Sequence, residues 1–143
     1  MNNKFLEKYG PWAVVTGASS GIGAEFVHQI AEKGLNIVLV ARRRQQLEAV
    51  AHSIENKYKV ETKIVEADLS KDGFQFDIFD AIKDLEVGLL VNNAGMNCEG
   101  QFYRGSLDRN LQMLQLNTKA PFILGYEFGK QFISRGKGGI IFT

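Results

Sequence analysis

A glycine-rich turn at residues 16–23, with the sequence TGASSGIG, carries the residue types that bind phosphate groups. Glycine lets a backbone turn sharply and lets a pyrophosphate approach closely, because it has no Cβ. The helix expected to follow presents free backbone N–H groups and the positive end of its dipole to an anion. Because the turn lies between a strand pattern and a helix pattern, a nucleotide site is favoured over a ligand-free turn. The residues expected to contact the nucleotide here are Gly17, Ser19, Ser20, Gly21, Ile22 and Gly23.

The kind of nucleotide is predicted by the residues that follow the second apolar run. In NAD-binding sites a carboxylate about 20 residues past the glycines holds the ribose 2′-OH. No Asp or Glu occurs between Glu32 and Glu48, and the run instead continues as Arg42-Arg43-Arg44. Guanidinium groups suit a 2′-phosphate. The alternative is a solvated basic start of a helix, although a cation there opposes the helix dipole. We predict that Arg42 selects NADP(H) over NAD(H).

Alternating strand and helix patterns surround these candidate residues. Apolar runs rich in β-branched residues predict strands at 12–16, 36–41, 62–66, 87–91 and 139–142. Amphipathic stretches between them predict helices at 21–33, 43–58, 74–82 and about 108–134. Continuous apolar strands are buried on both faces. We therefore expect a parallel sheet covered by helices, in one α/β unit spanning residues 1–143.

Some elements carry more detailed expectations. The third strand is the most polar, as suits a sheet edge, whereas the fifth, GIIF, has the apolar residues of a buried strand. In the first of these helices, the core-facing side is expected to hold Ile22, Phe26, Ile30 and Ala31. Pro121 is expected to kink the last helix, because proline has no backbone N–H to donate.

Further motifs follow the strands and lie in the long helix: ADLS at 67–70, NNAG at 92–95 and LNTKAPF at 116–122. Together with the glycine-rich turn, and in this order, they make the chain resemble the short-chain dehydrogenase/reductase family in its compact single-domain form. The resemblance implies a Rossmann-type, doubly wound parallel sheet with strand order 3-2-1-4-5. It also implies an NADP(H)-dependent oxidoreductase that reduces a small-molecule carbonyl or oxidises an alcohol by hydride transfer. Arg42 matches the arginine that NADP-preferring members carry after the second strand.

The resemblance also implies roles for residues within these motifs. Asp68, with Leu69 beside it, matches the family residue that accepts a hydrogen bond from the adenine amino group. The alternative is that Asp68 only caps the turn after the strand. Asn93, Ala94 and Gly95 match the stretch that passes over the adenine ring and its ribose, and Asn93 is also placed to brace the central sheet.

Asn117 is the candidate catalytic residue, because it matches the family asparagine that anchors a water in the proton relay. The alternative is that it only braces backbone carbonyls. The family's catalytic Ser, Tyr and Lys lie beyond the fifth strand, and nothing in residues 1–143 matches them. Tyr126 and Lys130 have the Tyr-x-x-x-Lys spacing but precede the fifth strand. At about 100° per residue, Tyr126 also falls on the helix face opposite Asn117.

Two interpretations follow for the chain as a whole. In the first, it is the N-terminal, cofactor-binding half of an oxidoreductase and has no dehydrogenase activity by itself. In the second, it is a non-catalytic nucleotide-binding module, complete as it stands. We favour the first, because Asn117 has little use without the tyrosine relay. The fifth strand would otherwise also be left as an apolar sheet edge.

Composition argues against several other functions. Lys and Arg number 17 against 16 Asp and Glu among 143 residues, and this balance gives no support for a nucleic-acid partner. No apolar run reaches the roughly 18–20 residues that span a bilayer. Cys98 is the only cysteine and the two histidines are scattered, so no metal site is predicted and a reducing, cytoplasmic location is expected. The family resemblance implies a homo-oligomer, because the long helix often packs against a partner subunit.

Overall fold

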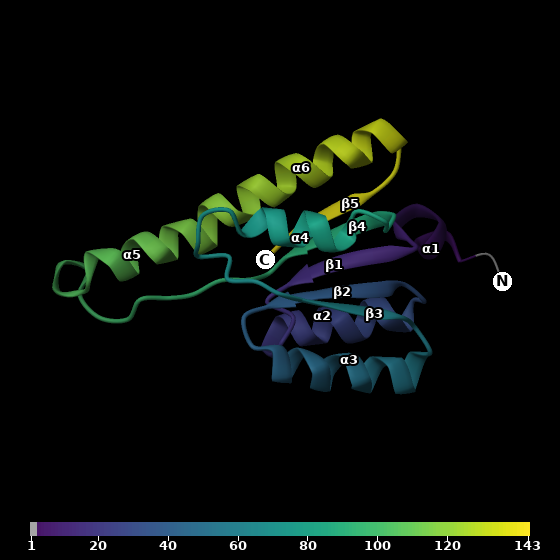
Figure 1. The fold of residues 1–143 in the computed structure, drawn as a ribbon, viewed down its shortest axis with the longest axis horizontal. Helices are drawn as coiled ribbons and strands as arrows, with labels where there is room; N and C mark the ends of the chain where they lie inside the picture. Colours follow the sequence, from purple (N-terminus) through teal and green to yellow (C-terminus); the bar gives the residue numbers. More distant parts are fainter. Residues whose placement is uncertain (1–2) are drawn as a thin grey trace.

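The computed structural model of the protein describes residues 3–143, which form one sheet covered by helices on both faces (Figure 1). The sheet has five parallel strands in the order β3-β2-β1-β4-β5. The expected doubly wound class and strand order are therefore confirmed. The strands are β1 (Trp12–Thr16), β2 (Asn36–Ala41), β3 (Thr62–Glu66), β4 (Val87–Asn92) and β5 (Gly139–Phe142).

The helices divide between the two faces of the sheet. One face is covered by α2 (Gly21–Glu32) and α3 (Arg44–Tyr58), and the other by α4 (Phe74–Ile82) and α6 (Ala120–Arg135) (Figure 1). A short helix, α1 (Lys4–Tyr9), was not predicted, because six residues are too few to show a helical period. Its first turn is capped by Asn3, whose Oδ1 accepts a hydrogen bond from the Leu6 N–H at 3.2 Å.

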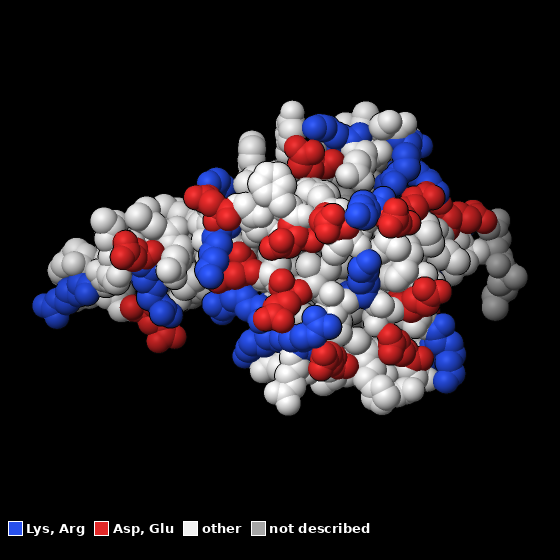
Figure 2. Space-filling view, in the orientation of Figure 1, with Lys and Arg blue, Asp and Glu red and all other residues white. Residues whose placement is uncertain are grey.

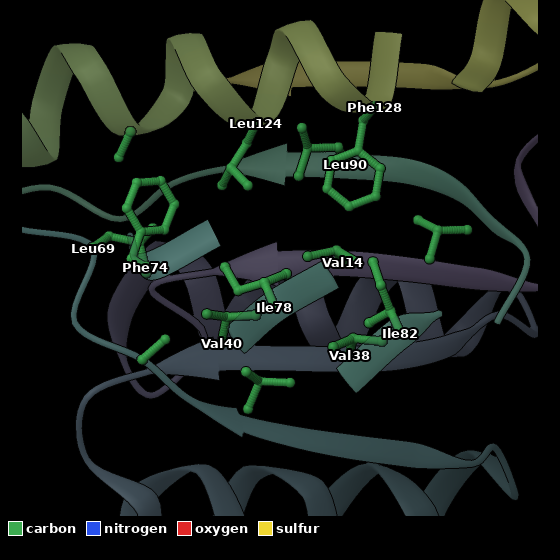
Figure 3. Close-up of a cluster of buried hydrophobic side chains, with 14 of the residues drawn as sticks. Val14, Val38, Val40, Leu69, Phe74, Ile78, Ile82, Leu90, Leu124 and Phe128 are labelled. Carbon is green, nitrogen blue, oxygen red and sulfur yellow. The ribbon is translucent and has the colours of Figure 1, made fainter. Parts of the chain in front are cut away.

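The core explains why the strands are continuously apolar. Alternate residues of each strand point to opposite faces, and both faces are packed against helices. Val14, Val38 and Leu90 lie on the α4 and α6 side, where Leu124 and Phe128 of α6 point toward β4 (Figure 3). The opposite face buries residues from β1, β2 and β4 against α2 and α3: Ala13, Val15, Ile37, Leu39, Leu89 and Val91.

The core-facing side of α2 differs from the expected one. Its buried residues are Gly23, Val27, Ile30 and Ala31, whereas Ile22 is 67% exposed. Gly23 packs so closely on the preceding turn that it determines which side of the helix faces the sheet. Ile22, one residue and about 100° away, is thereby turned toward solvent.

The long C-terminal helix runs from α5 (Leu107–Leu114) through a π-helical turn (Gln115–Lys119) into α6. Proline has no N–H to donate to the preceding turn, and the wider π turn lies immediately before Pro121. The expected sharp kink is absent from the described helix, since α5 and α6 follow a similar direction (Figure 1). The disturbance at Pro121 is therefore a local change of helix type.

Strand β5 lies at an edge of the sheet, as the expected strand order places it, although its apolar residues alone are typical of a buried strand. Ile141 is 36% exposed and Phe142 62% exposed, and within residues 3–143 the strand pairs with β4 alone. The other edge is β3, whose polar character was correctly read as an edge signal: Lys63 and Glu66 are exposed there. An apolar run predicts a strand well, but it does not reveal how many neighbours that strand has.

Phe128 and Ile133 test the packing of α6, because both are large apolar residues of one helix. Phe128 is fully buried, with its ring 5.2 Å from the Phe79 ring, whereas Ile133 is 83% exposed. We expect Phe128→Ala to lower the free energy of unfolding by about 3–5 kcal/mol through cavity formation. The control Ile133→Ala should change it by no more than about 0.5 kcal/mol. Urea denaturation followed by circular dichroism measures both, and equal losses would contradict this packing.

Candidate functional site

A cavity of about 220 Å³ opens at the carboxyl ends of β1, β2, β3 and β4. The strand order reverses direction at β1, and ligands of open α/β sheets bind at such a switch point. Most of the predicted nucleotide contacts line this cavity: Gly17, Ser19, Ser20, Arg42, Asp68, Leu69, Asn93, Ala94 and Gly95. Gly21, Ile22, Gly23 and the candidate catalytic residue Asn117 are not among the lining residues.

Further residues line the cavity that the sequence reading did not select: Val40, Ala41, Arg43, Ala67 and Leu116. Each is a direct chain neighbour of a selected residue or lies at the end of β2, and Leu116 is the neighbour of Asn117. Their positions could have been inferred from the rule that strand ends meet at one edge of a parallel sheet. Leu116 comes from the π-helical turn and opens the LNTKAPF motif, but it does not lie at a strand end.

Thr16 joins the two strands between which the cavity opens. Its buried Oγ1 accepts hydrogen bonds from the backbone N–H groups of Asn93 and Ala94, each at 3.0 Å. The same hydroxyl lies 3.4 Å from the Val91 carbonyl oxygen, to which it donates. One side chain therefore satisfies three backbone groups at the end of β4. This role was missed, because a threonine that ends a strand is ordinary in sequence.

The glycines of the turn serve different purposes. A Cβ on Gly23 would lie 2.0 Å from the Gly17 carbonyl oxygen and 2.5 Å from Asn93 Nδ2. Gly17 has φ +65°, and a Cβ there would lie 2.7 Å from the same Nδ2. These two glycines are required by the protein's own packing. At Gly21, with φ +56°, a Cβ would meet no described atom within 4 Å, so that part of the turn is open to an approaching group.

Asp68 is held as an acceptor beside the cavity. Its Oδ1 accepts hydrogen bonds from the Ser70 N–H at 3.0 Å and the Ser70 hydroxyl at 2.6 Å. Partial burial raises the pKa of Asp68, but these hydrogen bonds and the positive charges of Arg42 and Lys71 lower it, and the net pKa lies below its ordinary value. The carboxylate thus caps the local turn, as the alternative reading proposed, and also faces the cavity.

The three consecutive arginines separate into two environments. Arg42 and Arg43 line the cavity, whereas Arg44 turns along α3 and pairs with Glu48 at 3.1 Å. All three are exposed. Figure 2 shows Lys and Arg side chains gathered near the start of α3, at the carboxyl end of β2, with acidic groups beside them. Positive charge is therefore concentrated locally at the end of β2.

Asn117 lies in the π-helical turn, and its side chain makes two hydrogen bonds with the backbone of Met96. Its Nδ2 donates to the Met96 carbonyl oxygen at 2.7 Å, and its Oδ1 accepts from the Met96 N–H at 2.9 Å. The bracing role that the sequence left open is thus observed, and a catalytic role remains a prediction. Tyr126 is 60% exposed, and the Lys130 Nζ lies 5.1 Å from its ring centre, outside the cavity lining.

Comparison with known proteins identifies the family. A family model described as short chain dehydrogenase matches residues 11–143. The chain belongs to the short-chain dehydrogenase family. The inactive hydroxysteroid dehydrogenase-like protein 1 of Homo sapiens is 37% identical over 139 residues, covering 95% of this chain and 42% of that protein. The very-long-chain 3-oxoacyl-CoA reductase of Meyerozyma guilliermondii is 50% identical over 96 residues, covering 66% of this chain and 28% of that protein. The chain thus spans less than half the length of these relatives.

Solved short-chain dehydrogenases have the same fold. A structure of a 7β-hydroxysteroid dehydrogenase matches with a TM-score of 0.93 and 31% identity, over 99% of this chain and 54% of that one. A short-chain dehydrogenase from Sphingobium yanoikuyae, solved in complex with NADPH, matches with a TM-score of 0.87 and 31% identity, over 93% of this chain and 53% of that one.

Two other kinds of site were sought in the described part of the chain. Within residues 3–143, no group of three or more His, Cys, Asp or Glu side chains is placed to hold a metal ion. No helix in this range has the length and apolar character needed to cross a membrane.

Gly23→Ala and Gly129→Ala form a matched pair that tests the packing of the turn. Both residues lie within helices, where alanine is favoured over glycine by about 0.5–1 kcal/mol. At Gly129 the new methyl group would lie 3.9 Å from Ile140, an ordinary contact, so we expect a small gain in stability. At Gly23 it would collide with the Gly17 carbonyl, and we expect a net loss of about 1–3 kcal/mol in the free energy of unfolding. Chemical denaturation reports the sign of each change, and a gain at both positions would refute the close contact.

Proposed function

We propose that this chain forms the NADP(H)-binding part of an oxidoreductase that interconverts a carbonyl and an alcohol. One observation carries the proposal. The cavity combines an open glycine turn with two arginines at the end of β2, where NAD-binding sites carry a carboxylate. The NADPH complex of the Sphingobium yanoikuyae relative supports the choice of nucleotide.

The residues around the cavity fit the chemical parts of NADP(H). Gly17, Ser19 and Ser20 lie at the start of α2, where backbone N–H groups and hydroxyls suit the diphosphate. Within residues 3–143 the Ser20 side chain makes no capping hydrogen bond, so it leaves the first turn of α2 accessible. Gly21 leaves room for close approach. This open position beside the cavity supports the assignment of the turn to the diphosphate.

The adenosine end has matching polar groups. Arg42 and Arg43 supply guanidinium donors for a 2′-phosphate. Asp68, kept ionised by Ser70 and by the neighbouring cations, is an acceptor for the adenine amino group. Asn93 and the residues after it line the same cavity and provide a surface for the adenine ring and ribose.

Hydride transfer is the chemistry that NADP(H) supplies when bound, and the chain's own residues organise the site around it. The hydrogen bonds of Thr16 Oγ1 hold the end of β1 against the segment that follows β4. The phosphate turn and the adenosine surface therefore keep a fixed separation. Asn117 holds the backbone at Met96, just beyond the cavity. We propose that Asn117 contributes to a proton relay with residues from the remainder of the family fold.

The substrate class is proposed from the relatives' names alone. They include a very-long-chain 3-oxoacyl-CoA reductase and hydroxysteroid dehydrogenase-like proteins, which favours a carbonyl on a large apolar molecule. A second candidate function is a non-catalytic nucleotide-binding module. It is favoured by the human relative, which is 37% identical to this chain and named inactive.

Arg42→Ala tests the choice of nucleotide, with Arg44→Ala as its control. Arg42 lines the cavity, whereas Arg44 is engaged with Glu48 outside it. Loss of a charged hydrogen bond to the 2′-phosphate should weaken NADPH binding by about 10–100-fold and leave NADH binding unchanged. Arg44→Ala should leave both affinities within about twofold. Fluorescence titration gives these constants, and equal affinity of the unaltered chain for NADPH and NADH would contradict the proposal.

The chain is expected to bind the nucleotide without catalysing its oxidation. The 143-residue chain should bind NADPH and fail to oxidise it with a 3-oxoacyl or steroid ketone, because Tyr126 and Lys130 lie outside the cavity lining. Absorbance at the NADPH band measures turnover, and Tyr126→Phe is the control for any signal that appears. Turnover that Tyr126→Phe abolishes would overturn this prediction and assign catalysis to Tyr126.

A further inference from the structure

The side-chain amide of Asn93 links the ends of three neighbouring strands. Its Nδ2 donates to the Gly17 carbonyl oxygen, 3.3 Å away, just past the end of β1. Its Oδ1 accepts from the Thr143 hydroxyl, 3.1 Å away, just past the end of β5. Asn93 itself follows β4. A single planar group therefore connects the phosphate turn with the last strand of the sheet.

The two ends of this amide cannot be exchanged. A carbonyl oxygen only accepts hydrogen bonds, so the NH₂ end of Asn93 must face Gly17. The amide oxygen then faces Thr143, whose hydroxyl is the donor it needs. The Thr143 N–H is bonded to the Asn92 carbonyl oxygen at 3.1 Å, which holds the Thr143 backbone beside β4. The same carbonyl oxygen lies 3.5 Å from the Thr143 hydroxyl, a longer contact than the one to Asn93.

The position of the amide bears directly on the shape of the phosphate turn. Asn93 Nδ2 fits between Gly17 and Gly23, at positions where a Cβ would lie only 2.7 Å and 2.5 Å from it. Close packing on both sides means that a rotation of the amide must displace the turn. Gly17 and the serines that follow it line the cavity, whereas Thr143 does not.

We infer that Thr143 is a positioning residue for the diphosphate of the bound nucleotide, acting through the Asn93 amide on the glycine turn. This inference rests on the proposed NADP(H) site. Thr143 does not line the cavity, and the NH₂ end of the Asn93 amide that it bonds is packed against the phosphate turn. Thr143 and the phosphate-binding turn are thereby coupled through one side chain.

The test compares Thr143→Val, which removes the hydroxyl at nearly constant volume, with Thr143→Ser, which keeps it. Thr62→Val is a matched control, because the Thr62 hydroxyl bonds Glu55 at β3 and lies outside the cavity lining. Two ligands distinguish binding of the diphosphate from binding of the adenosine end. NADPH carries the diphosphate, whereas adenosine 2′-monophosphate has the adenine and the 2′-phosphate without a 5′-diphosphate. Dissociation constants come from titration, and urea denaturation verifies that each variant is folded.

We expect Thr143→Val to weaken NADPH binding about fivefold, the effect of one lost hydrogen bond, and to weaken adenosine 2′-monophosphate binding less, because the amide packs against the phosphate turn. Thr143→Ser and Thr62→Val should bind both probes as the unaltered chain does. Unchanged NADPH binding by Thr143→Val, or equal weakening of both probes, would overturn the inference. If Thr143→Val does not fold, Thr143→Ala is judged by the same two probes. Failure of the unaltered chain to bind NADPH would instead contradict the proposed function, and this inference with it.

Discussion

The hydroxyl of Thr16 is the interaction on which the geometry of the site depends. Beyond the ends of β1 and β4, the two segments of the backbone separate. The segment after β1 enters the phosphate turn, and the segment after β4 continues the NNAG motif. Backbone groups at that point lose their ladder partners, and leaving such groups unpaired costs about 1–3 kcal/mol each. Thr16 Oγ1 accepts from two N–H groups there and donates to the Val91 carbonyl. The cavity can therefore open at the switch point without leaving those backbone groups unpaired.

Much of the fold could be predicted from the sequence, because burial on two faces leaves a plain signal. Continuous apolar runs located all the strands, and the polar run at β3 marked an edge correctly. The other edge, β5, has no such signal in its residues, since Ile141 and Phe142 are as apolar as a central strand yet are exposed, and its edge position followed from the family's strand order alone. Ile22 was misplaced for a related reason. Periodicity gives the spacing of an apolar stripe, but the contact of Gly23 with the turn determines which stripe faces the sheet.

The candidate site was predictable in its location and less so in its reasons. Sequence patterns placed the glycine turn, Arg42 and Asp68 at one edge, and the structure brings them around one cavity. They did not show that Gly17 is required by its contact with the Asn93 amide, that Gly23 is required by its contact with the Gly17 carbonyl, or that Gly21 is the glycine that faces open space. A motif indicates that glycine is required at a position, whereas the structure shows which neighbouring atom leaves no room for a side chain. Contacts between distant segments, such as Asn117 with Met96, have no local sequence signal.

The segment after β4 is hydrogen-bonded to three other parts of the fold. Thr16 binds it from β1, Asn117 from the π-helical turn, and Thr143 from the end of β5. These bonds fall within residues 93–96, of which Asn93, Ala94 and Gly95 line the cavity. A displacement of any one neighbour is therefore transmitted to the surface proposed to carry the nucleotide. The same argument gives Asn117 a function that needs no proton relay, because fixing Met96 fixes the end of that surface. In such a fold, the hydrogen bonds that position the nucleotide surface would also position Asn117, the residue proposed for catalysis.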